Sequence, residues 1–187
     1  MKAFKKVILV GAAALLAVGA TACSSSSSSK DSSSKKPQTA KRAKNVNKTG
    51  KWSYSNKTFK TNKLTYKFTK AEVQPSAADG KNNLVLHVDV TNNSKKETDP
   101  GMEAYTYIHG TQKTSTSKVT LAPGTANLDD NGNSQFQAEE DNMNNKLLAG
   151  KTVKGVVMFE LKNDTPVTVT FDNAVFKTIG KEVYNVK

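Results

Sequence analysis

The segment from Asp129 to Glu140 carries side-chain oxygens at a spacing that suits a hard cation. Counted from Asp129, these oxygens fall at positions 1, 3, 5, 9 and 12, as in a calcium-binding loop. The glycine that such a loop needs at position 6 is replaced by Ser134, while Gly132 stands at position 4. Two interpretations stay open, an ion-binding loop and a solvated loop, and the composition favours the solvated loop. The candidate metal ligands are Asp129, Asn131, Asn133 and Glu140.

The two histidines are the other side chains suited to catalysis or metal binding. His87 and Asp89 share the outward face of a predicted strand, which fits a surface acid–base pair or simply a polar face. No nucleophile stands beside them in the sequence, and His109, just before Gly110, is expected in a loop at a strand end. Neither histidine has a His-x-His or His-x3-His partner, so zinc has little support. Without a phosphate-binding or nucleophile-elbow motif in the folded part, we predict a protein that is not an enzyme and holds no cofactor.

Cys23 is the single cysteine of the chain, which excludes a disulfide scaffold, a cysteine-rich zinc site and a CxxC redox motif. It follows a basic start, an apolar run at residues 7–19 and the small residues Ala20-Thr21-Ala22, as in an export signal. This arrangement resembles a bacterial lipobox, although Ala20 stands where leucine is more typical. The resemblance implies cleavage after Ala22 and lipidation of the Cys23 sulfur, and two acyl chains on one residue would give a stable anchor. The alternative is a free thiol behind an ordinary cleavage site.

Three compositional zones divide the 187 residues. Apolar residues number 17 in residues 1–23, 3 in residues 24–50 and 47 in residues 51–187, so only the last zone can close a core. We predict a lipoprotein signal peptide at 1–22, a lipidated, disordered Ser/Lys-rich tether at 23–50 and one folded domain at 51–187. The apolar run of the leader is too short for a permanent transmembrane helix. As a flexible coil the tether would span roughly 30 Å.

The formal charge of +12 arises mostly outside the folded zone. Residues 24–50 carry seven basic residues against Asp31, whereas residues 51–187 hold 18 lysines, no arginine and 15 acidic residues. Nucleic-acid-binding domains usually concentrate arginine and lysine on the folded surface, so we do not expect nucleic acid as a partner. The basic tether is either a solvated arm or a weak contact for anionic lipid or wall polymer.

Residues 51–187 show the alternation typical of half-buried strands, interrupted by clusters of Asn, Asp, Gly and Lys. The expected strands lie at Leu64–Phe68, Leu84–Val90, Tyr105–Gly110, Pro166–Phe171 and Val183–Val186. Val153–Leu161 is apolar on both faces, which predicts a central strand, while Asn142–Leu148 predicts no more than one helical turn. About seven short strands without a convincing helix favour an all-β fold, an immunoglobulin-like antiparallel β-sandwich.

Several phrases of the folded zone follow one another in an order typical of one family. They include Asn56-Lys-Thr-Phe59, Leu64-Thr-Tyr-Lys-Phe68, Val88-Asp-Val-Thr-Asn-Asn-Ser-Lys95, Gly150-Lys-Thr-Val153, Phe159-Glu-Leu161 and Pro166-Val-Thr-Val-Thr-Phe171. Over residues 55–187 the sequence resembles the DUF5067 domains of firmicute extracytoplasmic lipoproteins and the similar DUF4352 domains. The resemblance implies an immunoglobulin-like sandwich and brings no catalytic residues.

We therefore expect a lipoprotein anchored to the outer face of the cytoplasmic membrane, in the cell envelope. Its partners would be membrane lipid, through Cys23, and a cell-wall polymer or surface protein bound by a non-catalytic domain. The alternative is a carrier of a small ligand or of an ion such as calcium, which would need a concavity of about 300–1,000 Å3. A sandwich of this length rarely encloses one, so we favour the interaction module.

Overall fold

The computed structural model describes residues 52–187, which contain nine strands and two helices. The strands are β1 (Ser53–Ser55), β2 (Thr58–Lys60), β3 (Leu64–Pro75), β4 (Asn82–Asn92), β5 (Ile108–Lys113), β6 (Lys118–Thr120), β7 (Thr152–Glu160), β8 (Val167–Asp172) and β9 (Thr178–Tyr184). The helices are α1 (Pro100–Tyr107) and α2 (Gln137–Asn144). The predicted signal peptide at 1–22, the lipidation site Cys23 and the tether up to residue 50 lie outside the described residues. Neither of the two helices has the length and apolar character to cross a membrane.

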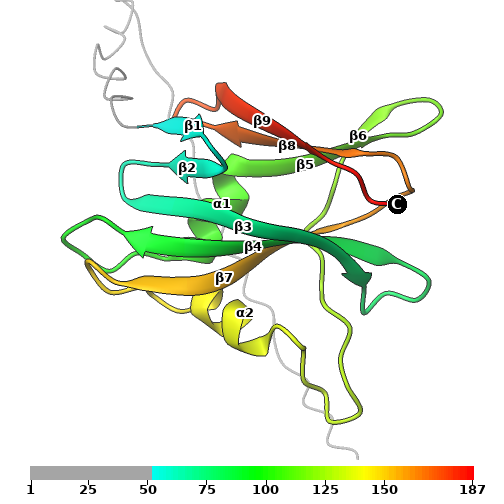
Figure 1. The fold of residues 1–187 in the computed structure, drawn as a ribbon, viewed down its shortest axis with the longest axis horizontal. Coiled ribbons are helices and arrows are strands. Elements are labelled where there is room, and N and C mark those ends of the chain that lie inside the picture. Colours follow the sequence, from blue (N-terminus) through cyan, green and yellow to red (C-terminus); the bar gives the residue numbers. More distant parts are fainter. Residues whose placement is uncertain (1–51) are drawn as a thin grey trace, which may run out of the picture. The chain divides into compact units, whose positions relative to one another are not determined.

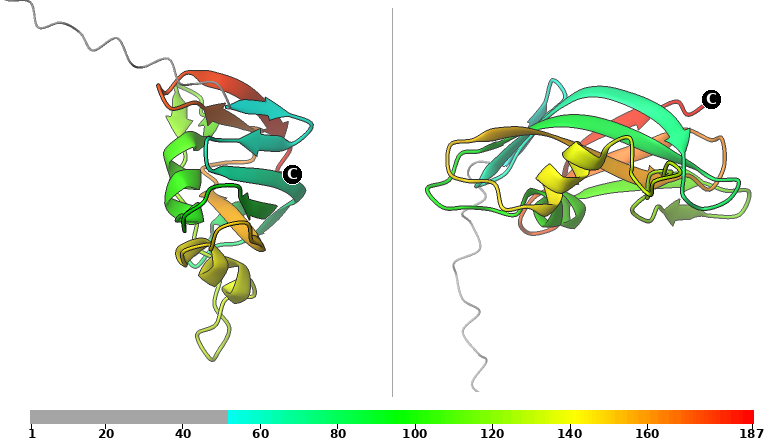
Figure 2. Two further views of the ribbon diagram at one scale, coloured as in Figure 1. Left: turned by 90° about the vertical axis from the view of Figure 1, so that its left-hand side faces the viewer. Right: turned by 90° about the horizontal axis from the view of Figure 1, so that it is seen from below.

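Two antiparallel sheets pack against each other in this part of the chain (Figures 1 and 2). One sheet has the strand order β1-β2-β3-β4-β7 and the other has the order β6-β5-β8-β9. The long strands β3 and β4 pair along most of their length, with a β-bulge between Phe68 and Lys70. The predicted β-sandwich is confirmed.

The core lies between the sheets, where the alternation in the sequence places it. Along β4 the alternate residues Leu84, Leu86, Val88 and Val90 are almost fully buried, while the polar residues between them are half-buried. Aromatic rings fill the centre of the core. The ring centroid of Phe59 lies 6.0 Å from that of Tyr66 and 5.4 Å from that of Phe171. The Tyr66 hydroxyl, buried among them, donates a hydrogen bond of 2.8 Å to the Pro100 carbonyl. This bond ties α1 to the core of the five-stranded sheet.

The prediction that Val153–Leu161 forms a central strand is wrong, because β7 is an edge strand of the five-stranded sheet. Both faces of β7 are nevertheless buried from Gly155 to Phe159. Val157 and Phe159 belong to the main core, while Val156 and Met158 belong to a second cluster. The crossover from β6 to β7 covers the outer face and completes that cluster, which consists of Val85, Ala126, Phe136, Val156 and Met158.

The two helices also correct the sequence prediction. Tyr105 and Tyr107 belong to α1 and not to a strand, and β5 begins only at Ile108. Asp99 caps α1 by accepting a hydrogen bond of 2.9 Å from the Met102 backbone N–H, and Pro100 follows at the first helical position. The second helix spans 137–144 and is therefore longer and earlier than the single turn predicted at 142–148.

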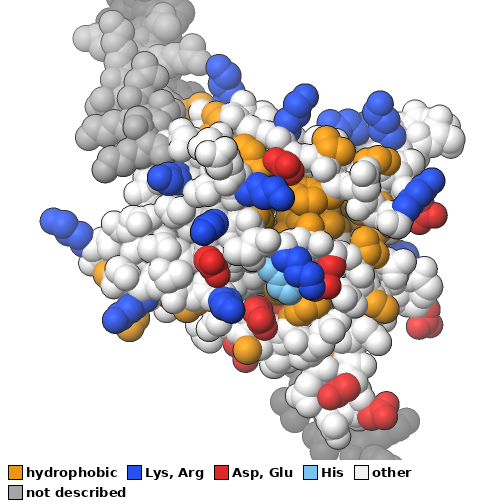
Figure 3. All heavy atoms as spheres, in the orientation of Figure 1, with side chains coloured by type: hydrophobic (Ala, Val, Ile, Leu, Met, Phe, Trp, Pro, Cys, Tyr) orange, Lys and Arg blue, Asp and Glu red, His pale blue; other side chains and the backbone are white. Residues whose placement is uncertain are grey.

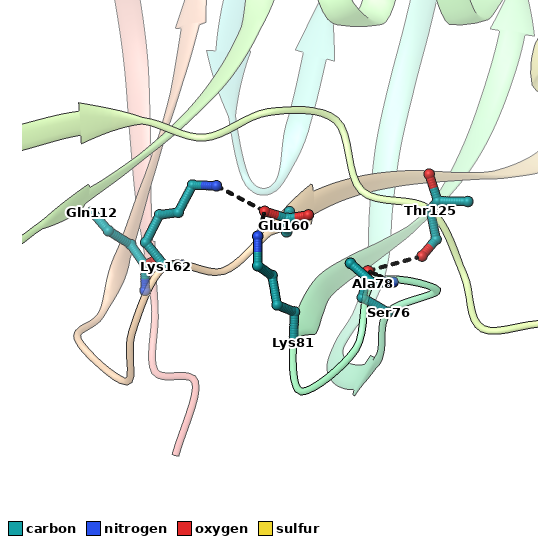
Figure 4. A network of polar contacts seen from close by, with 7 residues as sticks. All are labelled: Ser76, Ala78, Lys81, Gln112, Thr125, Glu160 and Lys162. Atoms are coloured by element: carbon teal, nitrogen blue, oxygen red, sulfur yellow. Dashed lines mark hydrogen bonds and ion pairs between the residues drawn. The ribbon is translucent and has the colours of Figure 1, made fainter.

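Polar contacts fix one end of the sandwich (Figure 4). The Glu160 carboxylate accepts hydrogen bonds from Lys81 at 2.8 Å and from Lys162 at 2.7 Å, and these two cations lower the pKa of Glu160 to about 2. Ser76, at the end of the β3–β4 pair, donates to the Thr125 carbonyl of the crossover. The β3–β4 turn, the end of β7 and the crossover are thus held together.

Candidate functional site

A pocket of about 580 Å3 lies between α1, α2, the segment Pro123–Gly124 and the outer face of β7. Its lining residues are Asp99, Gly101, Met102, Tyr105, Pro123, Gly124, Gln137, Glu140, Met143, Asn144, Val156 and Met158. The sequence analysis did not predict α1 and predicted only one turn at 142–148 near α2, so it missed this concavity. The Asp99-Pro100 start of α1 was the signal that could have indicated it, since such a pair is typical of a helix N-terminus.

Three thioethers and a phenol form the less polar part of the pocket. The lining includes Met102, Met143 and Met158, which are the chain's methionines other than Met1. Their flexible, polarisable side chains adapt to ligands of different shape. The Tyr105 hydroxyl accepts a hydrogen bond of 3.2 Å from the Met158 backbone N–H. Burial raises the pKa of Tyr105, and the Glu140 charge adds to that shift, so the phenol stays protonated at neutral pH and keeps a proton to donate.

The charge of the pocket has the opposite sign to the charge of the chain. Asp99 and Glu140 contribute carboxylates, and none of the twelve lining residues is Lys, Arg or His. One oxygen of Asp99 is engaged by the N-terminus of α1. In a chain with a formal charge of +12, this local arrangement favours a cationic ligand through Coulomb attraction.

The predicted ion-binding loop is built as a turn whose first carboxylate binds the backbone. The Asp129 Oδ1 atom accepts N–H groups from Asn131 at 2.9 Å and from Asn133 at 2.8 Å, and these bonds lower the pKa of Asp129. Gly132 has a φ of +80°, which permits the tight turn. Glu140 lies on α2 instead, where it lines the pocket. In residues 52–187 no group of three or more His, Cys, Asp or Glu side chains is arranged to hold a metal ion, and calcium binding by this loop stays the untested alternative to a solvated loop.

His87 pairs with Glu72 on the neighbouring strand, not with Asp89. The Nε2 atom of His87 lies 2.6 Å from a Glu72 oxygen, and the same carboxylate accepts a hydrogen bond of 2.8 Å from Lys70. The hydrogen bond from Lys70, and to a smaller extent the contact with His87, lower the pKa of Glu72 to about 2. The His87 ring also meets the Phe136 ring edge-on at 5.6 Å. Figure 3 shows acidic and basic side chains close together on the face in view, with apolar side chains beside them, and the Lys70–Glu72–His87 contacts fit the interpretation of a polar face.

His109 lies in β5 and not in the predicted loop. Its Nε2 atom is 3.7 Å from an oxygen of Asp172 on the paired strand β8. The prediction was wrong because the strand continues past Gly110, whose lack of a side chain makes room for the Phe159 ring: a Cβ atom there would lie 2.9 Å from it. Gly110 is thus a close-packing position inside a strand and does not end it.

Comparison with known proteins gives a family and a fold. A sequence profile described as "Domain of unknown function (DUF5067)" matches residues 39–173. Among solved structures, the chain is similar to a candidate lipoprotein from Staphylococcus aureus, with a TM-score of 0.63 and 16% identity, covering 72% of this chain and 91% of the other. A protein from Enterococcus faecalis has a TM-score of 0.59 and 18% identity, with 74% and 96% covered. At such identities the likeness shows the fold alone. No curated protein matches the chain.

Proposed function

The chain belongs to the DUF5067 family, and from this premise we propose that it is a membrane-anchored surface lipoprotein whose sandwich is a non-catalytic binding module. The observation that carries the anchoring is the sequence Ala20-Thr21-Ala22-Cys23 with a serine run directly after it. The similar fold of a candidate staphylococcal lipoprotein supports the same role. Because lipidation places two acyl chains on one residue, it would hold the domain at the outer face of the membrane.

The pocket supports binding rather than catalysis. Its lining consists of thioethers, amides, apolar groups, one phenol and two carboxylates, without the hydroxyl or thiol of a Ser, Thr or Cys nucleophile beside a histidine. Such a lining can hold a ligand through shape and charge. A cell-wall component or a segment of a surface protein would reach it from the open side.

Replacing the lipidation site tests the anchoring. In a bacterial host with a lipoprotein pathway, we expect the wild-type protein to incorporate a labelled fatty acid and to sediment with membranes. Cys23→Ser should abolish the labelling and leave the precursor uncut, because the sulfur that accepts the diacylglyceryl group is gone. A double variant Cys23→Ser/Ser29→Cys, which restores a thiol six residues later, is the matched control and should behave like Cys23→Ser. Normal processing and membrane retention of Cys23→Ser would contradict the proposal.

A second candidate function is transport or storage of a small cationic ligand, which the volume and the acidic lining of the pocket favour. The pocket falls within the range of about 300–1,000 Å3 usual for small-molecule sites. Spermidine, choline and Ca2+ serve as probes, and a true ligand raises the melting temperature Tm by mass action. Glu140→Gln should reduce that rise, whereas Glu139→Gln, whose side chain lines a different hollow with His87, should not. Equal responses of the two variants would refute a site at this pocket.

A further inference from the structure

The turn between β8 and β9 exposes two adjacent apolar residues, Val175 and Phe176. Their exposed fractions are 44% and 66%, and among residues 52–187 they are the only neighbours in sequence among the large exposed apolar side chains. Phe176 also has a φ of +55°, in the left-handed region. A bulky side chain in that region is a costly exception. The exposure and the backbone conformation of this position are thus both unfavourable for phenylalanine. We therefore look for a role of Phe176 other than stabilising the fold.

The turn is built so that this conformation persists. The buried Asn173 accepts N–H groups from Val175 and from Lys177 through its Oδ1 atom, both at 3.1 Å. Its backbone N–H donates to the Lys177 carbonyl at 3.0 Å, and the Phe176 N–H donates to the Asn173 carbonyl at 2.8 Å. Four hydrogen bonds centred on one buried residue therefore hold the backbone of the turn, and with it the left-handed conformation of Phe176.

Phe176 continues into a row of aromatic rings that ends where the tether joins the domain. Its ring stacks on Tyr107 with a centroid separation of 5.8 Å, and Tyr107 meets Trp52 edge-on at 4.7 Å. Trp52 is the first described residue, 29 positions after Cys23. Figure 1 shows the β8–β9 turn beside the start of β1. As a flexible coil, a segment of this length would span about 30 Å, which would keep this end of the domain within reach of the surface that holds the proposed anchor.

Basic side chains flank the aromatic row. Lys177 follows Phe176 directly, and Lys63 lines a hollow that also contains Tyr107. The same hollow also contains three carboxylates, Glu97 and Asp99 before α1 and Glu103 in its first turn, whereas Tyr107 ends the helix. Lys177, next to Phe176 at the turn itself, is therefore the cation on which the electrostatic part of the contact depends. Aromatic residues beside lysines are the combination that binds at the interface of an anionic bilayer, since the rings enter the headgroup region and the cations meet the phosphates.

We propose that Val175 and Phe176 insert into the outer surface of the anionic membrane to which the protein is anchored, and thereby orient the domain on it. The proposal rests on the anchoring proposed above, because Cys23 supplies the proximity. The pocket between α1 and α2 would then be presented in a constant direction.

The test uses the mature lipidated protein, with its acyl chains verified by mass, in vesicles of phosphatidylglycerol and brominated phosphatidylcholine. In a Trp52→Phe background, Phe176→Trp places the only indole at the turn, and Val183→Trp places it at a similarly exposed position of β9 (59% exposed). We expect several-fold stronger quenching at position 176 than at position 183, falling at high salt. Equal quenching at both positions, or none at either, overturns the contact. Verified lipidation keeps that result separate from a failure of anchoring.

A second variant separates the proposed contact from a structural role. Asn tolerates the left-handed region and is polar, so Phe176→Asn should leave Tm unchanged or raise it, while hydrogen exchange in residues 173–177 should lose its slowing on vesicles. A ring that serves the fold alone predicts the reverse, a lower Tm with unchanged protection by vesicles. Protection of 173–177 in wild-type protein by neutral and anionic vesicles alike overturns the electrostatic part of the proposal.

Discussion

Burial destabilises the charged form of the Glu103 carboxyl group. Burial raises the pKa of Glu103, and this effect outweighs the hydrogen bond from the Thr61 hydroxyl and the charge of Lys63, which lower it. A group whose pKa is higher in the folded state stabilises the fold fully below its unfolded pKa, near 4.5 for this carboxyl. That contribution is lost as the pH rises through the folded value. At neutral pH the burial of Glu103 therefore opposes folding.

Removing the charge of Glu103 should stabilise the domain at neutral pH. Glu103→Gln keeps the oxygen that accepts from Thr61, so we expect a higher Tm than wild type at pH 7 and no difference below about pH 4. Thermal unfolding between pH 3 and 8 measures both. Glu160→Gln is the control of opposite sign. The pKa of Glu160 is lowered to about 2 in the folded protein, so its charge stabilises the fold at pH values above its unfolded pKa. We therefore expect Glu160→Gln to have a lower Tm than wild type at pH 7. A lower Tm of Glu103→Gln at pH 7 would contradict the assignment.

For single residues, the sequence predicts which side chains face outward but not which side chains contact each other. His87 and Asp89 are two positions apart and do share a face, yet the partner of His87 is Glu72. That pairing depends on the cross-strand register, which shifts at the bulge between Phe68 and Lys70. A bulge adds one residue to one strand and leaves no clear mark in a single sequence. Glu72 therefore could not be named from the periodicity of β4.

Among the elements, the crossover between β6 and β7 carries α2 and depends on one ring. Phe136 is buried against Val85, Val156 and Met158, on the side of the sheet opposite the main core. We expect Phe136→Ala to lower the free energy of unfolding by about 3 kcal/mol, as for other buried aromatic rings, and to loosen the α2 side of the pocket. Denaturant unfolding measures the loss. Leu148→Ala, at a site that is 60% exposed, should change stability by less than about 0.5 kcal/mol; equal losses would mean that Phe136 does not support the crossover.

The two helices show why short elements escape periodicity. Each spans eight residues, too few to be stable by themselves, so tertiary contacts decide their formation. For α2 the decisive contact is Met143 on Gly155: a Cβ atom at residue 155 would lie 2.4 Å from the Met143 sulfur. A side chain at residue 155 would force the Met143 thioether to move away from β7. The capping pair Asp99-Pro100 was readable in the sequence, but the aromatic residues after it favoured a strand.

For the whole molecule, composition and alternation sufficed for the class of fold but not for the position of each strand. The two-sheet architecture and the family were predicted from β3, β4 and β8 and from the quoted phrases. An apolar run on both faces, as in β7, is expected for a central strand. Here β7 is an edge strand, and the crossover buries its outer face as fully as the face that meets the core. The sequence of the strand does not show whether a second sheet or a crossover covers each of its faces. The same crossover lines the pocket together with α1, so the error in the fold and the missed site share part of their cause.

The boundary of the folded unit gives the last prediction. The family match begins at residue 39, whereas composition places the start of the domain at residue 51. The core residues of the described part all lie between Phe59 and Val186, and Trp52 packs against that core. We therefore expect chains that begin at Ser24, Thr39 and Lys51 to unfold at the same Tm, since a segment with only three apolar residues adds little burial. Trp52 fluorescence during heating measures this, because the single indole reports the start of the domain. A chain from Lys51 that melts below the chain from Thr39 would move the boundary to the start of the family match.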